Sequence, residues 1–156
     1  MNKSKKIKDR KIPNDVFITP KNVVKKMIEM ISIQEDETIL DPCKGEGAFY
    51  DELTGRKDWC EISLGKDFYD YKEQVDVIIG NPPFSQWDRW MDHTVSLQPK
   101  RICYLFGALN LTPNRLKKLS LHGYHVTKLC FIRINGYFGH SYLTLLEKKQ
   151  GIIDIL

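Results

Sequence analysis

The sequence contains no apolar run long enough to cross a bilayer and no pattern typical of a secretory signal peptide. It contains only four cysteines, which are widely spaced and include no Cys-x-x-Cys pair. This spacing argues against a zinc site or a disulfide framework and favours free thiols in a reducing compartment. The four histidines show no metal-ligand spacing. We therefore expect a cytoplasmic protein that enters no membrane and binds no metal.

The composition that remains is that of an ordinary globular protein. Hydrophobic residues make up 42% of the 156 positions and charged residues 28%, which fits one domain. The formal net charge of +4 permits an anionic partner without requiring one. Residues 3–11 are rich in lysine and arginine. We expect residues 1–12 to form a flexible basic arm, either simply solvated or in contact with nucleic-acid phosphates, ahead of a single domain over residues 13–156.

The most informative stretch is Asn81-Pro82-Pro83-Phe84, which follows an apolar run at residues 75–80. That run is short and rich in β-branched residues, so it predicts a buried strand. The prolines end the strand, and Pro82 biases Asn81 towards an extended conformation. Open α/β sheets bind ligands at the carboxyl ends of their strands. The sequence thus predicts an amide and an aromatic ring at a ligand-binding edge.

A second motif follows another predicted strand, at residues 38–42. It consists of Asp41, Pro42, Gly45, Gly47 and Phe49. Two glycines in such a loop let the backbone approach a ligand closely and adopt dihedral angles that other residues avoid. We expect a helix over residues 48–53 to follow the loop. The third glycine of a dinucleotide fingerprint is missing, which disfavours NAD.

Together these motifs resemble those of the adenine-N6 amino methyltransferases of nucleic acids, which are class I enzymes that use S-adenosylmethionine. The Asp-Pro-x-x-Gly-x-Gly-x-Phe stretch resembles their cofactor loop, and Asn-Pro-Pro-Phe resembles their catalytic motif. Phe17-Ile18-Thr19-Pro20 resembles the turn that contacts the methionine end of the cofactor, and it precedes the glycine motif as in the gamma class. From the residues alone, Thr19 is a plausible N-cap, with Pro20 first in a helix that extends to about residue 31.

The resemblance implies a set of cofactor contacts. They are Phe17, Thr19, Pro20, Asp41, Pro42, Gly45, Gly47, Phe49, Glu61, Asp67, Phe68 and Asn81. Asp41 would orient the cofactor's amino group, and Glu61, about 20 residues further on in a predicted strand over residues 59–62, would reach the ribose hydroxyls. Asp67 would accept from the adenine amino group and Phe68 would flank that ring. The gap between the two acids is too short for the usual crossover helix, so either acid remains a candidate for the ribose.

The resemblance also implies how the Asn-Pro-Pro-Phe stretch would act on a base. The side-chain oxygen of Asn81 and the carbonyl of Pro82 would accept the two hydrogens of an adenine amine. Phe84 would stack on the base, and Pro83 completes the rigid turn. Trp87 either joins the apolar face of a helix over residues 85–97 or lines the base pocket.

The whole pattern predicts an α/β, Rossmann-like class I methyltransferase fold. We expect a mostly parallel sheet with helices on both faces and an antiparallel hairpin at the carboxyl end. The later elements are a strand over residues 101–106, a helix over 114–121 and strands over 125–134 and 141–147. Tyr137 or Phe138, in the link between the last two strands, would stack on the base, with Phe138 preferred.

The function that this resemblance implies is methylation of the N6 amine of adenine in DNA, as in restriction–modification. The alternatives are adenine methylation of ribosomal or transfer RNA, methylation of a protein glutamine, and a non-catalytic module that binds nucleic acid or a partner. We expect no separate target-recognition domain. Specificity would then come from short loops, a homodimer or a separate specificity subunit.

Overall fold

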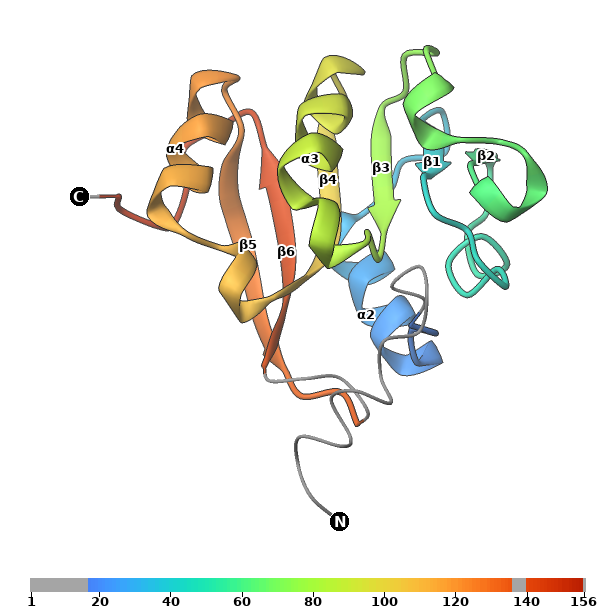
Figure 1. Cartoon of the computed structure of the whole chain (residues 1–156), viewed down its shortest axis with the longest axis horizontal. Coiled ribbons are helices and arrows are strands. Elements are labelled where there is room, and N and C mark those ends of the chain that lie inside the picture. The colour runs from blue at the N-terminus through green and yellow to red at the C-terminus, as the bar shows by residue number, and fades with distance from the viewer. Residues whose placement is uncertain (1–16, 136–139, 156) are drawn as a thin grey trace.

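A computed structural model describes residues 17–135 and 140–155, and its centre is a six-stranded sheet in the order β2-β1-β3-β4-β6-β5 (Figure 1). The strands are β1 Thr38–Asp41, β2 Arg56–Trp59, β3 Val77–Gly80, β4 Arg101–Gly107, β5 His125–Ile132 and β6 Ser141–Glu147. The first four strands are parallel, whereas β6 is antiparallel to both of its neighbours. The predicted parallel sheet with a terminal antiparallel hairpin is confirmed.

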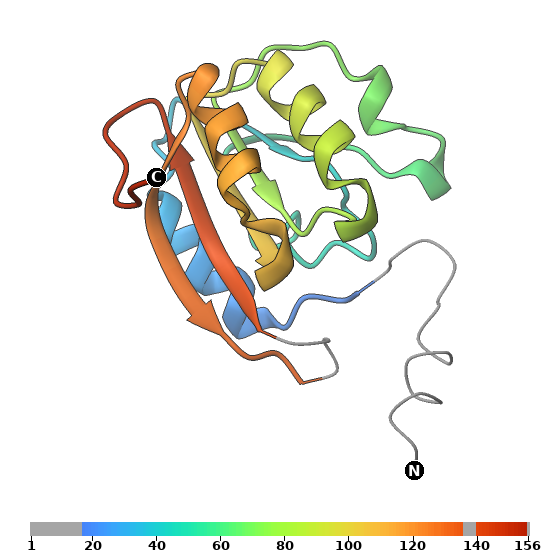
Figure 2. The same ribbon diagram turned by 60° about the vertical axis from the view of Figure 1, so that its left-hand side comes forward.

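Helices cover both faces of this sheet, as predicted. They are α2 Lys21–Ile31, α3 Trp87–Ser96 and α4 Pro113–Leu121. Figure 2 shows α3 and α4 side by side on one face, with α2 on the other. Because neighbouring residues of a strand point to opposite faces, Val77 and Ile79 pack on the α2 side while Ile78 packs on the α3 side. Burial on both sides explains why β3 is apolar throughout.

The connection from β2 to β3 is short, as the spacing of its two acids predicted. Along it the structure forms two single 3₁₀ turns, η1 Ile62–Leu64 and η2 Phe68–Asp70, and within the described residues no strand or α-helix lies between β2 and β3. β2 is therefore the edge of the sheet. Its sequence Arg-Lys-Asp-Trp is charged, which suits an edge because charged side chains discourage pairing with another chain.

Two predicted elements near this edge were wrong. The second strand ends at Trp59, so Glu61 lies beyond its carboxyl end rather than inside a strand over residues 59–62. Residues 48–53 form successive turns rather than a continuous helix. Only isolated helix-type bonds occur there, such as Asp51 N to Gly47 O (2.9 Å) and Leu53 N to Phe49 O (3.1 Å). Gly47 has a φ of +99°, outside the helical range, so no helical conformation extends back through this residue into the loop.

The basic arm, Tyr137 and Phe138 lie outside the described residues. In the described part of the chain, none of the helices has the length and apolar character needed to cross a membrane. The same residues contain no cluster of three or more potential metal ligands.

Candidate active site

Three loops meet at the carboxyl edge of the sheet, which is the lower edge in Figure 1. They are the glycine loop (residues 42–47) after β1, the segment after β2, and the Asn-Pro-Pro-Phe turn (residues 81–84) after β3. Hydrogen bonds join them. The amide of Gly45 donates to Glu61 Oε2 (2.8 Å), and the thiol of Cys43 donates to the backbone carbonyl of Asn81 (3.2 Å). The structure therefore brings the separate sequence motifs to one place.

The side chain of Asn81 is fixed by the turn before α2. Its Nδ2 donates to the carbonyl of Phe17 (3.3 Å) and to Oγ1 of Thr19 (3.2 Å). The predicted N-cap role of Thr19 is therefore wrong. The N-cap residue is Pro20, and the helix start has no side-chain capping bond. Since the amide nitrogen is committed to two acceptors, Oδ1 is the atom of Asn81 that is suited to accept hydrogens from a substrate.

The rest of the Asn-Pro-Pro-Phe turn is braced by the end of β4. Pro82 is buried, whereas Pro83 and Phe84 are half-buried. The carbonyl of Phe84 accepts from Asn110 Nδ2 (3.4 Å), and a methyl group at Gly107 would lie 3.6 Å from the Phe84 ring. Asn110 was not predicted as a site residue. The signal that could have indicated it is an asparagine shortly after the predicted strand over residues 101–106.

Asp41 is a fully buried acid at the end of β1, with an exposed fraction of 0%. Its Oδ1 accepts from the amide of Cys43 (3.3 Å), while Oδ2 makes no hydrogen bond to any residue that the structure describes. Burial raises the pKa of Asp41 to about 7, and the nearby amides of Cys43 and Tyr50 only partly oppose this shift. A buried carboxylate oxygen without a partner fits a ligand that brings a positive charge or hydrogen-bond donors.

The glycine loop leaves room for such a ligand to approach the backbone. Gly45 and Gly47 have φ values of +53° and +99°, which other residues rarely adopt. A Cβ atom at Gly47 would lie 2.8 Å from Oδ2 of Asp51. The loop conformation and the space around it therefore depend on glycine.

Glu61 and Asp67 occupy different positions. Glu61 accepts from the amide of Gly45, and from the amide (3.0 Å) and hydroxyl (2.6 Å) of Ser63. Burial opposes its ionisation, but these donors outweigh the desolvation and lower the pKa of Glu61. Asp67 instead accepts from the amide of Tyr69 (3.0 Å) and caps η2. Glu61 is thus the acid that is bonded to the glycine loop.

Two aromatic residues that were predicted to contact the cofactor lie in the core. Phe49 is 3% exposed and packs on the α2 side of the sheet. Phe68 is 2% exposed, and its ring centre lies 4.5 Å from that of Trp90 and 4.7 Å from that of His93. With no crossover helix in this connection, Phe68 fills the core beneath α3. Its ring is therefore covered by protein and offers little surface to an adenine ring.

Other apolar side chains are exposed where Phe68 is not. Ile62 and Leu64, on the turn that follows Glu61, are 71% and 60% exposed. Neither residue was predicted as a contact, although Ile62 directly follows the candidate ribose acid Glu61 in the sequence. Trp87 is a core residue at 3% exposure, and its ring lies 5.7 Å from that of Phe106. Of its two predicted positions, Trp87 therefore occupies the apolar face of α3 rather than a base pocket.

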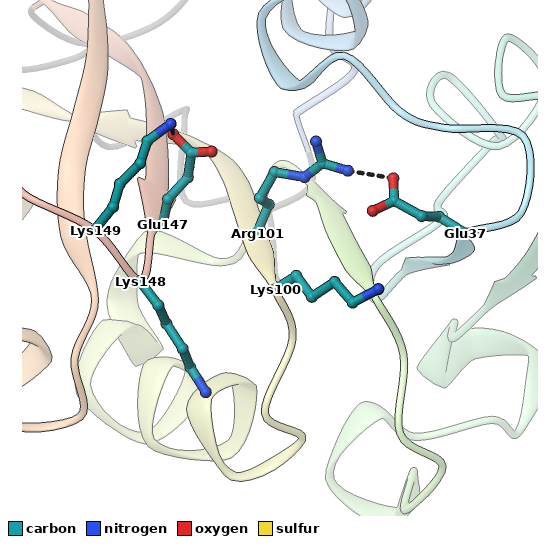
Figure 3. A pocket seen from close by; sticks show the side chains of 6 residues that line it. All are labelled: Glu37, Lys100, Arg101, Glu147, Lys148 and Lys149. Atoms are coloured by element: carbon teal, nitrogen blue, oxygen red, sulfur yellow. Dashed lines mark hydrogen bonds and ion pairs between the residues drawn. The ribbon is translucent and has the colours of Figure 1, made fainter.

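Two hollows lie away from this edge. One, of about 380 Å³, is at the opposite edge of the sheet, where Arg101 pairs with Glu37 and Lys149 with Glu147 (Figure 3). The other, of about 450 Å³, is apolar and lies between α4, the β5–β6 hairpin and the last described residues. Neither is lined by a residue of the glycine loop or of the Asn-Pro-Pro-Phe turn. Neither hollow therefore belongs to the candidate site, which is defined by the contacts among the three loops.

Comparison with known sequences finds relatives for part of the chain. No protein-family model matches it. Two Type II methyltransferases of Haemophilus influenzae, M.HincII and M.HindII, are each 31% identical over 93 residues. The match covers 50% of this chain but only 18% of each relative. The matched half of this chain therefore corresponds to less than a fifth of each relative.

Comparison with solved structures gives the fold. The 23S rRNA methyltransferase ErmE has a TM-score of 0.64 at 13% identity, over 87% of this chain and 71% of ErmE. Magnesium protoporphyrin IX methyltransferase from Synechocystis, solved with bound S-adenosylmethionine, has a TM-score of 0.65 at 14% identity. The match covers 82% of this chain and 77% of that protein. A chain of the Mtq2–Trm112 complex of E. cuniculi, which is responsible for methylation of the termination factor eRF1, has a TM-score of 0.64 at 17% identity. The match covers 86% of this chain and 99% of that one. At these identities the likeness establishes the Rossmann-like methyltransferase fold, which serves very different substrates.

Proposed function

We propose that this protein transfers a methyl group from S-adenosylmethionine to the exocyclic N6 amine of adenine in DNA. The observation that carries the proposal is the fixed amide of Asn81. Its nitrogen is bonded to Thr19 and Phe17, and its backbone is bonded to Cys43 of the glycine loop. An amide held in this way, in a proline-rich turn on a methyltransferase fold, is suited to bind an amine as an acceptor.

The residues of the edge fit the cofactor. The unpaired, buried oxygen of Asp41 suits its ammonium group, and the backbone at Gly45 and Gly47 suits close approach. We assign the ribose hydroxyls to Glu61 rather than Asp67, because Glu61 is bonded to the glycine loop. The exposed side chain of Ile62 offers an apolar surface for the adenine ring in place of Phe68. When bound, S-adenosylmethionine would supply an electrophilic methyl group and leave as S-adenosylhomocysteine, and the proton that the amine loses would pass to water.

The Asn-Pro-Pro-Phe turn would supply the rest of the chemistry. Asn81 Oδ1 and the carbonyl of Pro82 accept the two amine hydrogens, which favours a tetrahedral nitrogen with its lone pair directed out of the ring plane. Phe84 stacks on the base and fixes that plane. The rate enhancement comes mainly from this positioning. In a duplex the base must first be flipped out of the stack, at a cost of a few kcal/mol.

The choice of DNA is supported by the likeness to the two Type II methyltransferases. We propose that sequence specificity comes from a second copy of the chain or from a separate specificity subunit. A protein glutamine and a non-catalytic binding role remain alternatives that the first experiment separates from nucleic-acid methylation.

The test is incubation of the protein with methyl-labelled S-adenosylmethionine and equal masses of unmethylated DNA and unmodified cellular RNA. We expect label in DNA, recovered as N6-methyladenine. Label in RNA alone would replace the DNA target with RNA. Label in neither, together with measurable cofactor binding, would contradict the proposal and direct the search to a protein substrate.

A variant separates transfer from cofactor binding. Asn81→Ala is expected to abolish transfer while the cofactor Kd changes by less than about threefold, since the amide is required mainly for the substrate amine. Asn114→Ala is the matched control, because it removes the same group from an exposed position on α4. Transfer that survives in Asn81→Ala would rule out the assigned mechanism.

A further inference from the structure

An arginine stack adjoins the Asn-Pro-Pro-Phe turn on the α3 face. The guanidinium carbon of Arg89 lies 3.7 Å from the centre of the Tyr69 ring. The hydroxyl of Tyr69 donates to Oε1 of Gln86 (2.7 Å), and Gln86 follows Phe84 by two residues. Tyr69 itself lies on η2, two residues after Asp67. The stack is therefore anchored both to the turn after β3 and to the segment after β2.

The exposed side chain of Arg89 makes no direct ion pair with any residue that the structure describes. A second arginine gives the contrast. Arg115 also lies over an aromatic ring, that of Trp87 at 4.6 Å, but its guanidinium binds the carboxylate of Asp88 at 3.0 and 3.3 Å. Of these two stacked arginines near the turn, Arg89 alone is left with its charge for an external anion.

We propose that Arg89, stacked on the Tyr69 ring that Gln86 anchors, binds a backbone phosphate of the nucleic acid next to the target adenine. A guanidinium that stacks on a ring keeps the N–H groups in its own plane for a ligand, and its fork of donors matches a phosphate. The stack also fixes the side chain in advance, which lowers the entropy that binding would otherwise cost. Arg89 lies in the first turn of α3, and only the 3₁₀ turn η3 Phe84–Gln86 separates this helix from the Asn-Pro-Pro turn, so Arg89 is close in the chain to the proposed base site. This inference rests on the proposed function.

The salt dependence of binding tests it. Affinity for a fluorescent 24-base-pair duplex is measured by anisotropy between 50 and 200 mM salt, without cofactor. The plot of log K against log salt has a negative slope, and loss of one phosphate contact decreases the magnitude of that slope by about 0.9. We expect this decrease for Arg89→Ala and no change for Lys25→Ala. Lys25 is an exposed cation on α2, on the opposite face of the sheet, and its removal changes the net charge equally.

Two further variants address the anchoring. Arg89→Lys retains the charge, so we expect it to keep the slope while weakening binding a few-fold. Tyr69→Leu removes the ring beneath the guanidinium, and we expect weaker binding. Because Tyr69 also packs against the core beside Phe68 and Trp90, a thermal melt checks that this variant is folded under the conditions of the assay. An unchanged slope in Arg89→Ala, or an equal decrease in Lys25→Ala, would overturn the assignment. Because the assay needs neither cofactor nor transfer, the inference can fail while methylation of DNA is confirmed, and the reverse also holds.

Discussion

The amide nitrogen of Asn81 lies 3.2 Å from the hydroxyl of Thr19, a residue 62 positions earlier in the chain. One residue belongs to the turn after β3 and the other to the turn before α2, so this bond joins the two ends of the site. Thr19 is 4% exposed, which protects the bond from competition by water. The contact connects the segment that resembles a cofactor-binding turn with the segment that would bind the substrate.

Removal of the Thr19 hydroxyl should therefore affect transfer more than cofactor binding. Thr19→Val preserves the shape of the side chain but leaves the Asn81 amide with one acceptor fewer. A hydrogen bond of this kind contributes about 1 kcal/mol, so we expect kcat to fall roughly fivefold. Thr19→Ser, which keeps the hydroxyl, should retain most of the activity. A larger loss in Thr19→Ser than in Thr19→Val would show that the methyl group of Thr19 matters rather than its hydroxyl.

Prediction from the sequence succeeds for the motifs whose signals are local. The β-branched run before Asn81 and the glycines at 45 and 47 are local signals, because they express strand burial and backbone conformation at their own positions. The strand, the turn and the loop were therefore placed correctly. The shortened connection after β2 was also visible, since the chain between its two acids is too short for a helix.

What failed depends on residues far apart in the sequence. A threonine before a proline and an apolar helix looks like a helix cap, and only the fold shows that its partner is Asn81. Phe68 next to an acid looks like a ligand-binding ring, yet the missing helix leaves a space that this ring fills. Arg89 could not be distinguished from other surface cations, because its significance comes from the ring of Tyr69 beneath it.

Asp41 predicts a pH dependence of cofactor binding. Because the pKa of Asp41 is raised to about 7, the carboxylate that would bind the cofactor's ammonium forms only as the pH rises through that value. We expect affinity for S-adenosylmethionine to increase about tenfold between pH 6 and pH 8, as the ionised fraction does, and then to level off. Calorimetric titration across this range measures the effect. In Asp41→Asn the increase should disappear, and an identical profile in the variant would exclude Asp41 as its source.

The stability of the free protein should change in the opposite direction. The pKa of Asp41 is about 7 in the folded state, whereas the ordinary pKa of an aspartate side chain is 3.8. Between these two pH values the folded state therefore binds more protons than the unfolded state. Stability contributed by this group therefore falls as the pH rises from about 4 to 7. Asp41→Asn should lack this decrease. Thermal melts of both proteins at pH 5 and pH 8 measure the difference, and an equal shift in both would contradict the assignment.

We expect substitution of Gly47 to cause a loss of cofactor binding that backbone strain alone does not explain. Gly47→Ala places a Cβ atom 2.8 Å from the carboxylate of Asp51 at a φ of +99°. Gly55→Ala is the matched control, because its φ is +88° but nothing lies within 4 Å of the added atom. Each change should cost about 1–2 kcal/mol of stability through the positive φ. Only Gly47→Ala should also weaken cofactor binding, by at least tenfold, because Asp51 and the loop must shift. Similar cofactor affinities in the two variants would contradict a role for this loop.

We expect loss of the Cys43 thiol to have a smaller effect on the Asn-Pro-Pro-Phe turn, which this thiol contacts from the glycine loop. It donates to the backbone carbonyl of Asn81 at 3.2 Å, and burial raises the pKa of this thiol, which keeps it protonated as a donor at neutral pH. Cys43→Val removes the donor at similar volume, and we expect kcat to fall about threefold with little change in the cofactor Kd, because a thiol is a weak donor. Cys43→Ser restores a donor and should recover most of that loss. Since a purely packing role would favour valine over serine, higher activity in Cys43→Val than in Cys43→Ser would show that the bond does not position Asn81.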